Sequence, residues 1–243
     1  MTLPSRNGDI IMMKADNEII SYREMCDREE VQTLQRGMNY RLSGRHSVVL
    51  MSLRHNAPYS DRVDSNGLIL IYEGHDIPKT ANSPDPKTVD QPEYNPSGSL
   101  TQNGLFHQAA QAYKQGQKSA EIVQVYQKLF NGVWSDNGKF RLTDSWMEKS
   151  GNRKVFKFIL ELCDKSVGHS KQRMNIEQNR IIPSQVKMEV WKRDKGRCVE
   201  CGATDNLHFD HIIPYSKGGS SLTANNIQLL CARHNLLKKD KIE

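Results

Sequence analysis

The sequence has no long apolar run. Its longest, Leu68-Ile69-Leu70-Ile71-Tyr72, is far shorter than the roughly 20 residues that a membrane helix needs. Residues 1–10 lack a basic stretch followed by an apolar one, so we expect no secretory signal. The mean hydropathy is −0.68, so the chain is strongly polar. These absences argue against the membrane, secreted and fibrous classes of protein.

Cysteine is also scarce, with five residues among 243. They are Cys26, Cys163, Cys198, Cys201 and Cys231. Three of the five fall in residues 165–243. Because no secretory signal is expected, a reducing compartment and a metal site are favoured over a framework of disulfides.

The basic excess is confined to one part of the chain. Residues 1–164 carry 20 Lys and Arg against 20 Asp and Glu, whereas residues 165–243 carry 14 against 8, a net charge of +6. A local surplus of this kind suits a polyanionic partner such as a nucleic acid. A merely solubilising surface fits the same numbers, so the charge indicates a class of partner without deciding it.

Alternating apolar and polar residues predict a sheet in the first two thirds of the chain. The expected strands are 46–52, 68–72, 121–129, 139–146 and 154–162. Turn dipeptides Asn131-Gly132 and Asn137-Gly138 and the tripeptide Ser150-Gly151-Asn152 separate the later strands. An apolar face predicts a helix over 100–116, and a weaker pattern allows one within 21–38. Residues from about 40 to 164 therefore read as one α+β domain with a strongly bent sheet.

Two polar stretches interrupt this pattern. Residues 75–99 hold five of the nine prolines, a density that excludes regular elements. Residues 166–185 are polar and basic, and they contain Pro183, so they read as a linker. We therefore divide the chain into a front domain of residues 1–165, this linker, and a small C-terminal domain of residues 186–243.

Two short motifs in the C-terminal domain have the spacing of metal ligands. The first is Cys198-Val199-Glu200-Cys201 and the second is Cys231-Ala232-Arg233-His234. Together they supply three thiolates and one imidazole, a set that suits tetrahedral zinc. In a domain this small the metal would contribute much of the folding free energy. The alternative is a group of unrelated buried cysteines.

The residues between and after these motifs resemble a nuclease family. They are Asp210-His211, Pro214, Gly218-Gly219, Asn226 ahead of an apolar strand, Asn235 and Lys238. In this order they are similar to the HNH endonucleases of the ββα-metal type, in the subgroup that carries a structural zinc. The resemblance covers residues 186–243 and implies hydrolysis of phosphodiester bonds with Mg²⁺ or Mn²⁺ in addition to the zinc.

The resemblance also implies a role for each residue. His211 would be the general base, since an imidazole titrates near neutral pH. Asp210 and Asn235 would offer oxygen ligands to the catalytic metal. Asn226 would hold the loop that presents His211, unless it is an ordinary turn residue. Many relatives have a cysteine where this chain has His234, which is either the fourth zinc ligand, as its spacing favours, or a catalytic residue.

The front domain resembles a second family in the order of its parts. The pieces are Gly44-Arg45-His46-Ser47-Val48-Val49-Leu50, the segment 59–74, the helix start at 99–103, and the strands within 121–162. They are similar to the SRA domain, which reads modified cytosine by flipping the base out of the duplex. The resemblance covers about 120 residues and implies a bent, SRA/PUA-like β-barrel with helices.

The resemblance places the pocket for the flipped base in the segment 59–74. We expect its lining to come from Tyr59, Asp61, Asp64, Tyr72 and Glu73. An extruded base needs aromatic faces above and below it and hydrogen bonds to its edge. A direct count puts Arg62 where the family has its base-reading Asp, so Asp61 takes that role only after a local shift. The alternative is that the two tyrosines are ordinary loop and core residues. Residues 78–98 could form either a DNA-inserting loop or a disordered insert.

Together these features predict a modification-dependent restriction endonuclease acting on double-stranded DNA. The modified base could be 5-methylcytosine, 5-hydroxymethylcytosine or a bulkier derivative, and a restriction role implies the cytoplasm of a prokaryote. One HNH site cuts one strand, so a double-strand break requires a homodimer or two visits. The alternatives are a reader that binds modified DNA without cutting it, and a nuclease whose front domain binds unmodified DNA or protein.

Overall fold

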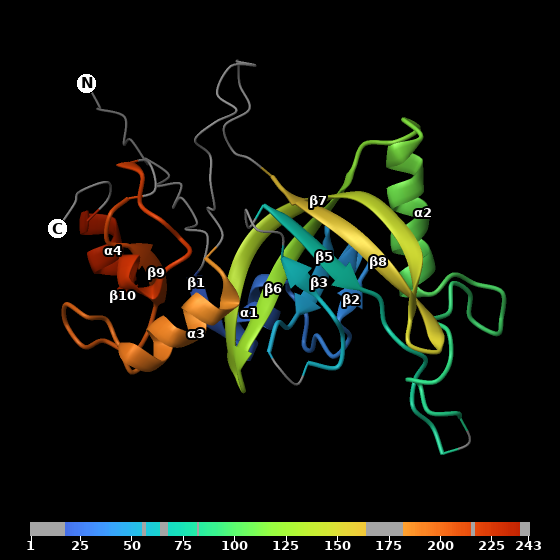
Figure 1. Ribbon diagram of the computed structural model, residues 1–243, viewed down its shortest axis with the longest axis horizontal. Helices are drawn as coiled ribbons and strands as arrows, with labels where there is room; N and C mark the ends of the chain where they lie inside the picture. Colours follow the sequence, from blue (N-terminus) through green and yellow to red (C-terminus); the bar gives the residue numbers. More distant parts are fainter. Residues whose placement is uncertain are drawn as a thin grey trace, which may run out of the picture.

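The computed structural model describes residues 18–54, 57–63, 68–81, 83–163, 182–214 and 217–238 (Figure 1). The strands are β1 (Glu18–Ser21), β2 (Met38–Asn39), β3 (Ser47–Met51), β4 (Arg62–Val63), β5 (Ile69–Glu73), β6 (Glu121–Phe130), β7 (Val133–Ser150), β8 (Arg153–Leu162), β9 (Leu207–His211) and β10 (Ile227–Cys231). The helices are α1 (Tyr22–Arg28), α2 (Gln102–Lys114), α3 (Ser184–Arg193) and α4 (Ala232–Lys238), with the short 3₁₀ turns η1 (Leu42–Gly44) and η3 (Ala224–Asn226). The predicted α+β class is confirmed.

The long strand β7 organises the sheet. Its order is β10-β9-β1-β7-β6-β3-β2, and β8 joins β7 to β5 and β4. Residues 133–142 of β7 pair with β6, while residues 140–150 pair with β8. Because β7 changes partners along its length and its pairing shifts register in three places, the sheet bends strongly instead of lying flat. Figure 1 shows this bend in the yellow-green strands.

One predicted turn is wrong. Asn137-Gly138 lies inside β7, not between two strands. The Gly138 amide donates to Asp136 Oδ1 at 3.0 Å, and Gly138 has a φ of +84°. This local kink is accommodated because β6 continues to pair on both sides of it. The other two predicted turns are confirmed, since Asn131-Gly132 joins β6 to β7 and Ser150-Gly151-Asn152 joins β7 to β8.

Helix α2 covers one face of the bent sheet. It begins after Thr101, whose hydroxyl accepts from the Gly104 amide at 3.2 Å, and it ends before Gly116 with a φ of +70°. A side chain at position 104 would place its Cβ 2.4 Å from the Glu93 carbonyl, so only glycine fits there. Phe106 and Ala110 project from α2 into the front core.

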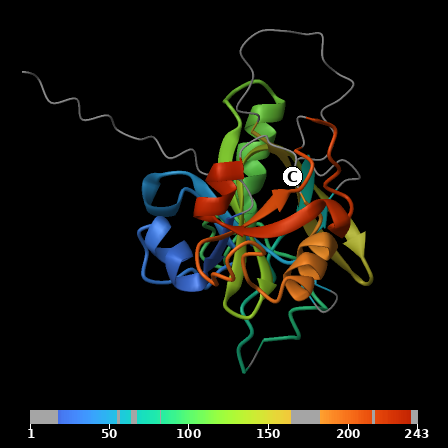
Figure 2. The same cartoon turned by 90° about the vertical axis from the view of Figure 1, so that its left-hand side faces the viewer.

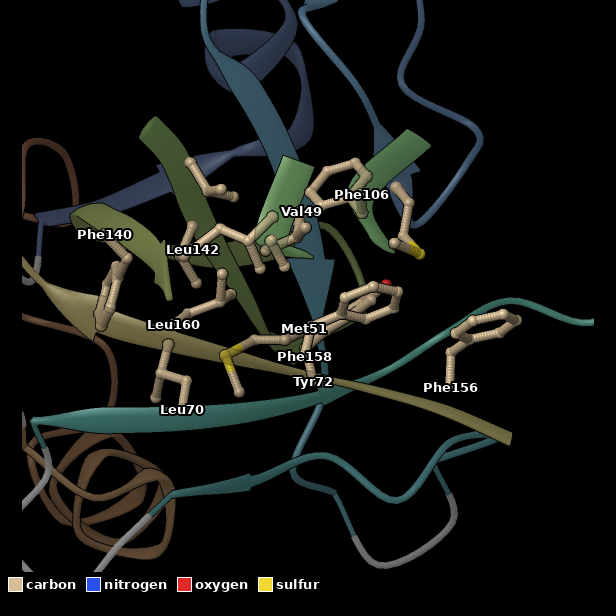
Figure 3. Packing of buried hydrophobic residues seen from close by; sticks show 14 residues of the cluster. Val49, Met51, Leu70, Tyr72, Phe106, Phe140, Leu142, Phe156, Phe158 and Leu160 are labelled. Carbon is tan, nitrogen blue, oxygen red and sulfur yellow. The ribbon is translucent and has the colours of Figure 1, made fainter. Parts of the chain in front are cut away.

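The front core contains aliphatic and aromatic side chains from β2, β3, β5, β6, β7, β8 and α2, as Figure 3 shows. The strand predictions correspond to β3, β5, β6, β7 and β8, and the predicted helix is α2. Within the region 21–38, only the short helix α1 is helical. Residues 75–99 contain no helix or ladder strand among their described residues, as expected from their prolines. No described helix is long and apolar enough to cross a membrane.

The C-terminal domain is a β-hairpin flanked by two helices. Strands β9 and β10 pair antiparallel, with His211 opposite Ile227 and Leu207 opposite Cys231. Figure 2 shows this part, in orange and red, in front of the bent sheet. The predicted linker falls largely on residues 164–181, which lie outside the described residues. The domain boundaries themselves stay a prediction.

The two domains share a sheet and a core. Strand β1 pairs antiparallel with β7 along its whole length, and its first residue Glu18 also pairs with His208 of β9. Leu129 of β6 belongs to the same buried apolar cluster as Val186, Val190 and Leu229 of the C-terminal domain. The C-terminal domain therefore docks on the front domain through β1 and the ends of β6 and β7.

A fully buried lysine crosses this junction. Lys187 of α3 donates to Ser135 Oγ at 2.9 Å and to Asn137 Oδ1 at 2.8 Å, both on β7. Burial lowers the pKa of Lys187 from 10.5 to about 7, although the carboxylate of Asp136 acts in the opposite sense. A cation here is held by neutral acceptors, so it is costly to keep charged.

The buried lysine predicts a specific dependence of stability on pH. Between about pH 7 and 10.5 the unfolded chain keeps the Lys187 proton that the folded chain gives up. The unfolded state therefore binds more protons, and the free energy of unfolding should rise with pH through this window. We expect this rise to be reduced in Lys187→Met, measured as denaturant unfolding of both proteins from pH 7 to 9.5. Parallel profiles would contradict it.

Candidate metal centre and active site

The four predicted zinc ligands lie together. Their ligand atoms all fall within 4.8 Å of one another, at the residues Cys198, Cys201, Cys231 and His234. Cys201 Sγ is 3.8 Å from Cys231 Sγ, and His234 Nδ1 is 3.4 Å from the sulfurs of both Cys198 and Cys231. Ligands of a tetrahedral zinc at about 2.0–2.3 Å stand about 3.3–3.8 Å apart. The residues therefore fit zinc, and the sulfur separation is too long for a disulfide.

Local backbone geometry brings the ligands to this point. Cys198 and Cys201 lie in a tight turn after α3, where the Gly202 amide donates to the Cys198 carbonyl at 2.8 Å. Cys231 ends β10 and His234 lies in the first turn of α4. Burial raises the pKa of the Cys198 thiol, but hydrogen bonds to its sulfur outweigh burial and lower it to about 6. Thiolate is the form that binds a metal.

Asp210 and His211 end strand β9 beside a buried cation. Lys238 is 2% exposed, and its ammonium donates to Asp210 Oδ2 and to the His211 carbonyl. Gln228 of β10 also approaches Asp210 Oδ2, at 3.4 Å. Within the described residues, Asp210 Oδ1 accepts no hydrogen bond. That oxygen is available to a metal ion, so the donor set fits a hard divalent cation.

The imidazole of His211 is held by a serine. His211 Nε2 lies 2.7 Å from Ser221 Oγ, and Ser221 is fully buried. Burial lowers the pKa of His211, the Asp210 carboxylate raises it, and the Lys238 ammonium lowers it again. The net direction is downward, which favours the neutral imidazole that a general base requires.

Asn226 ties together both ends of the loop that follows His211. Its Oδ1 accepts from the Ile213 amide at 2.9 Å, and its Nδ2 donates to the carbonyls of Ile213 and Ser220 at 3.2 and 3.0 Å. Gly219 fits against this arrangement because a Cβ there would lie 1.8 Å from the Ile213 carbonyl oxygen. Asn226 therefore sets the path of the loop that contains Ser221.

Asn235 lies in α4, one turn before Lys238. Residues three apart on a helix share a face, so Asn235 is on the side of α4 that carries Lys238 toward Asp210. Its role as a ligand of the catalytic metal stays a prediction. Ser221 and Lys238 were not assigned a role from the sequence, although Lys238 was part of the motif. The role of Lys238 becomes visible only in the structure, because an ammonium group that is 2% exposed must be paired.

The residues predicted for a base pocket occupy different environments. Tyr72 is 4% exposed in the front core, as Figure 3 shows, and its hydroxyl donates to the Gly37 carbonyl at 3.0 Å. Tyr59 is half-buried, and the ammonium of Lys87 lies 4.2 Å from its ring centroid. Asp64 lies outside the described residues.

The two remaining candidates are tied into the protein. Asp61 accepts from the Ser52 amide at 3.1 Å and the Glu73 amide at 3.0 Å. Burial raises the pKa of Asp61 to about 6, although these two bonds lower it. Glu73 is buried and accepts from Lys157 Nζ at 2.7 Å and from the Ser60 amide at 3.1 Å. Hydrogen bonds of Asp61 and Glu73 therefore hold the backbone at residues 52, 60 and 73.

Comparison with known proteins identifies the C-terminal domain. Residues 198–241 match the family model of the HNH endonucleases, so this part of the chain is an HNH domain. The predicted resemblance to that family is confirmed. No curated protein sequence matches the chain.

Solved structures similar to the chain include SRA domains and a nuclease. The SUVH5 SRA domain in complex with fully methylated CG DNA has 20% identity and a TM-score of 0.40, and the match covers 61% of this chain and 90% of that one. The modification-dependent TagI restriction endonuclease has 18% identity and a TM-score of 0.40, covering 95% and 79%. KRYPTONITE in complex with mCHG DNA and SAH has 14% identity and a TM-score of 0.40, covering 66% and 35%.

The ligand cluster makes a direct prediction about metal content. Purified protein should contain one zinc ion per chain, and Cys201→Ser should lose it because a hydroxyl is a poor substitute for a thiolate. Elemental analysis would measure the zinc. Thermal unfolding should show that the variant is also less stable, since the metal joins the turn after α3 to β10 and α4. Cys163→Ser, outside the cluster, is the matched control and should keep its zinc. Full zinc content in Cys201→Ser would exclude this site.

Proposed function

We propose that this protein is a modification-dependent DNA endonuclease, in which the front domain reads a modified cytosine and the HNH domain hydrolyses a phosphodiester bond. The observation that carries the nuclease part is the placement of Asp210 and His211 at the end of β9, with Asn226 holding the following loop. The reader part is supported by the SRA-like order of sequence elements in the front domain.

The geometry supports a division of chemical roles in the HNH domain. His211 removes a proton from the attacking water, with Ser221 fixing the orientation of the ring through Nε2. Asp210 Oδ1 and the Asn235 amide oxygen would hold Mg²⁺ or Mn²⁺. When bound, such an ion would stabilise the negative charge that develops on the phosphate and the leaving oxygen. Lys238 holds Asp210 and the His211 carbonyl in place from the buried side.

In the front domain, Tyr59 is the better candidate for stacking on an extruded base. Its ring is only half-buried, whereas Tyr72 is packed in the core and its hydroxyl is bonded to Gly37. Asp61 and Glu73 would lie at the edge of the pocket, held there by backbone amides and by Lys157. The modified base is 5-methylcytosine or 5-hydroxymethylcytosine in this proposal.

Digestion of matched DNA duplexes tests the whole proposal. Three substrates should carry cytosine, 5-methylcytosine or 5-hydroxymethylcytosine at the same sites, with Mg²⁺, Mn²⁺ or a chelator. We expect at least one modified duplex to be cleaved when Mg²⁺ or Mn²⁺ is present, and no duplex to be cleaved with the chelator. Binding without cleavage would indicate a non-cutting reader, and equal cleavage of all three duplexes would indicate a front domain with another role.

Removal of the proposed general base should abolish cleavage without weakening DNA binding. His211→Ala is expected to cut at least ~100-fold more slowly, because the base acts only in the chemical step. Single-turnover cleavage and a binding assay with chelator separate the two effects. Asn225→Ala changes an exposed residue of the same region and should cut at the parental rate. A His211→Ala protein that cuts as fast as the parent would exclude this residue as the base.

Truncation of Tyr59 should weaken binding to modified DNA selectively. Stacking of one base on an aromatic ring is worth ~1–3 kcal/mol, so Tyr59→Ala should lose about 5- to 150-fold in affinity for the modified duplex. Affinity for unmodified DNA should change little, because it rests on phosphate contacts. Tyr59→Phe keeps the ring and should bind like the parent. The measurement is the ratio of the two affinities at fixed salt, and an equal loss on both duplexes would contradict a stacking role.

A further inference from the structure

We infer that strand β1 and Lys187 hold the HNH domain at one fixed position on the front domain. The DNA strand is then cut at a set distance from the base that is read. This inference rests on the proposed function, and it concerns where the chain cuts instead of whether it cuts. Three independent sets of contacts carry it.

The first set is the backbone of β1. Its four residues pair with β7, from Glu18 opposite Asp136 to Ser21 opposite Val133. On its other edge Glu18 pairs with His208 of β9, so the sheet runs without a break from the front domain into the HNH domain. Figure 1 shows β1 between β9 and the bent sheet. Hydrogen bonds across a sheet fix both spacing and register.

The second set is apolar. Leu129 of the front domain is 1% exposed and lies in the core cluster of the HNH domain. Ile19, Phe130 and Val133 pack against the same cluster, and the ring centroid of Phe130 is 6.3 Å from that of Trp191 in α3. Separating the domains would therefore expose a core that both of them build.

The third set is polar and buried. Lys187 of α3 reaches both Ser135 and Asn137 on β7, as described above. Within the front domain, Arg28 of α1 pairs with Glu18 of β1 at 2.7 Å and with Asp136 of β7 at 3.2 Å, which holds β1 against β7. The two Lys187 bonds are directional, so they limit rotation as well as separation of the domains.

The expected spread of cut positions can be compared with that of a nuclease domain on a flexible tether. A flexible chain as long as the predicted linker, residues 166–185, has an end-to-end distance of about 25 Å. One step along a DNA strand is about 3.4 Å. A tethered nuclease would therefore cut over about seven consecutive positions, whereas a docked one would cut at one or two.

The experiment maps cut positions on duplexes that carry a single modified cytosine. Each strand end is read at single-nucleotide resolution, with the full-length, metal-loaded protein. We expect cuts at one or two adjacent phosphodiester bonds per strand. Cuts spread over seven or more positions would overturn the inference. Preferential cutting of the modified duplex is scored in the same assay, so failure of the proposed function is seen separately from failure of the fixed distance.

Backbone NMR relaxation tests the docking without any cleavage. A docked chain should give one rotational correlation time for amides of both domains, and two distinct times would overturn the inference.

The variant Lys187→Ala should broaden the cut pattern, and its folding is checked by its zinc content. Lys192→Ala is the matched control, because this lysine is exposed on the same helix. A Lys187→Ala pattern as narrow as that of the parent would contradict the role assigned to Lys187.

Discussion

A buried strand must satisfy its backbone hydrogen bonds on both edges, and at the first half of β7 this requirement shapes the rest of the molecule. Ser135 and Asp136 are buried, with β6 on one side. Strand β1 supplies the other side, and β9 then extends the sheet beyond β1. The HNH domain is thus part of what covers the edge of the front sheet, which explains why its core includes residues of β6 and β7.

Helix α4 connects the candidate metal cluster to the proposed active site. The candidate zinc ligands Cys231 and His234 lie at the end of β10 and the start of α4. One turn beyond His234, Lys238 enters the interior and donates to Asp210. An ammonium buried without a partner would cost several kcal/mol, so pairing with the Asp210 carboxylate and the His211 carbonyl favours this position of α4. The candidate metal cluster and the proposed catalytic carboxylate are therefore connected through a single helix.

Much of this arrangement could be predicted from the sequence because its signals are local. The alternation in β6 and β8 and the spacing of the cysteine motifs each depend on a few adjacent residues. Strand β1 could not be predicted in this way, since Glu18-Ile19-Ile20-Ser21 is short and its partners lie more than 100 residues away. Asn137-Gly138 reads as a turn, but pairing with β6 on both sides keeps it within β7.

Side-chain environments were the least predictable part of the candidate sites. Lys187 has the appearance of a surface residue in a polar helix, and only the docking of α3 on β7 buries it. Tyr72 lies at a position that alternation assigns to one face of a strand, but alternation does not say which face is the core. The contacts of Asp61 with the amides of Ser52 and Glu73 join segments that the sequence separates by a loop.

The two parts of the chain differ in net charge. The front part of the chain is neutral, and its buried pairs, such as Glu73 with Lys157, brace the segment proposed to read the base. Such pairs contribute little net stability, but they favour one arrangement of the groups they connect. The net charge of +6 lies in residues 165–243, where contacts with phosphates would supply affinity for any DNA sequence. In the proposed function, affinity and selectivity would then arise from different domains, and a fixed junction would let a contact in one of them determine where the other acts.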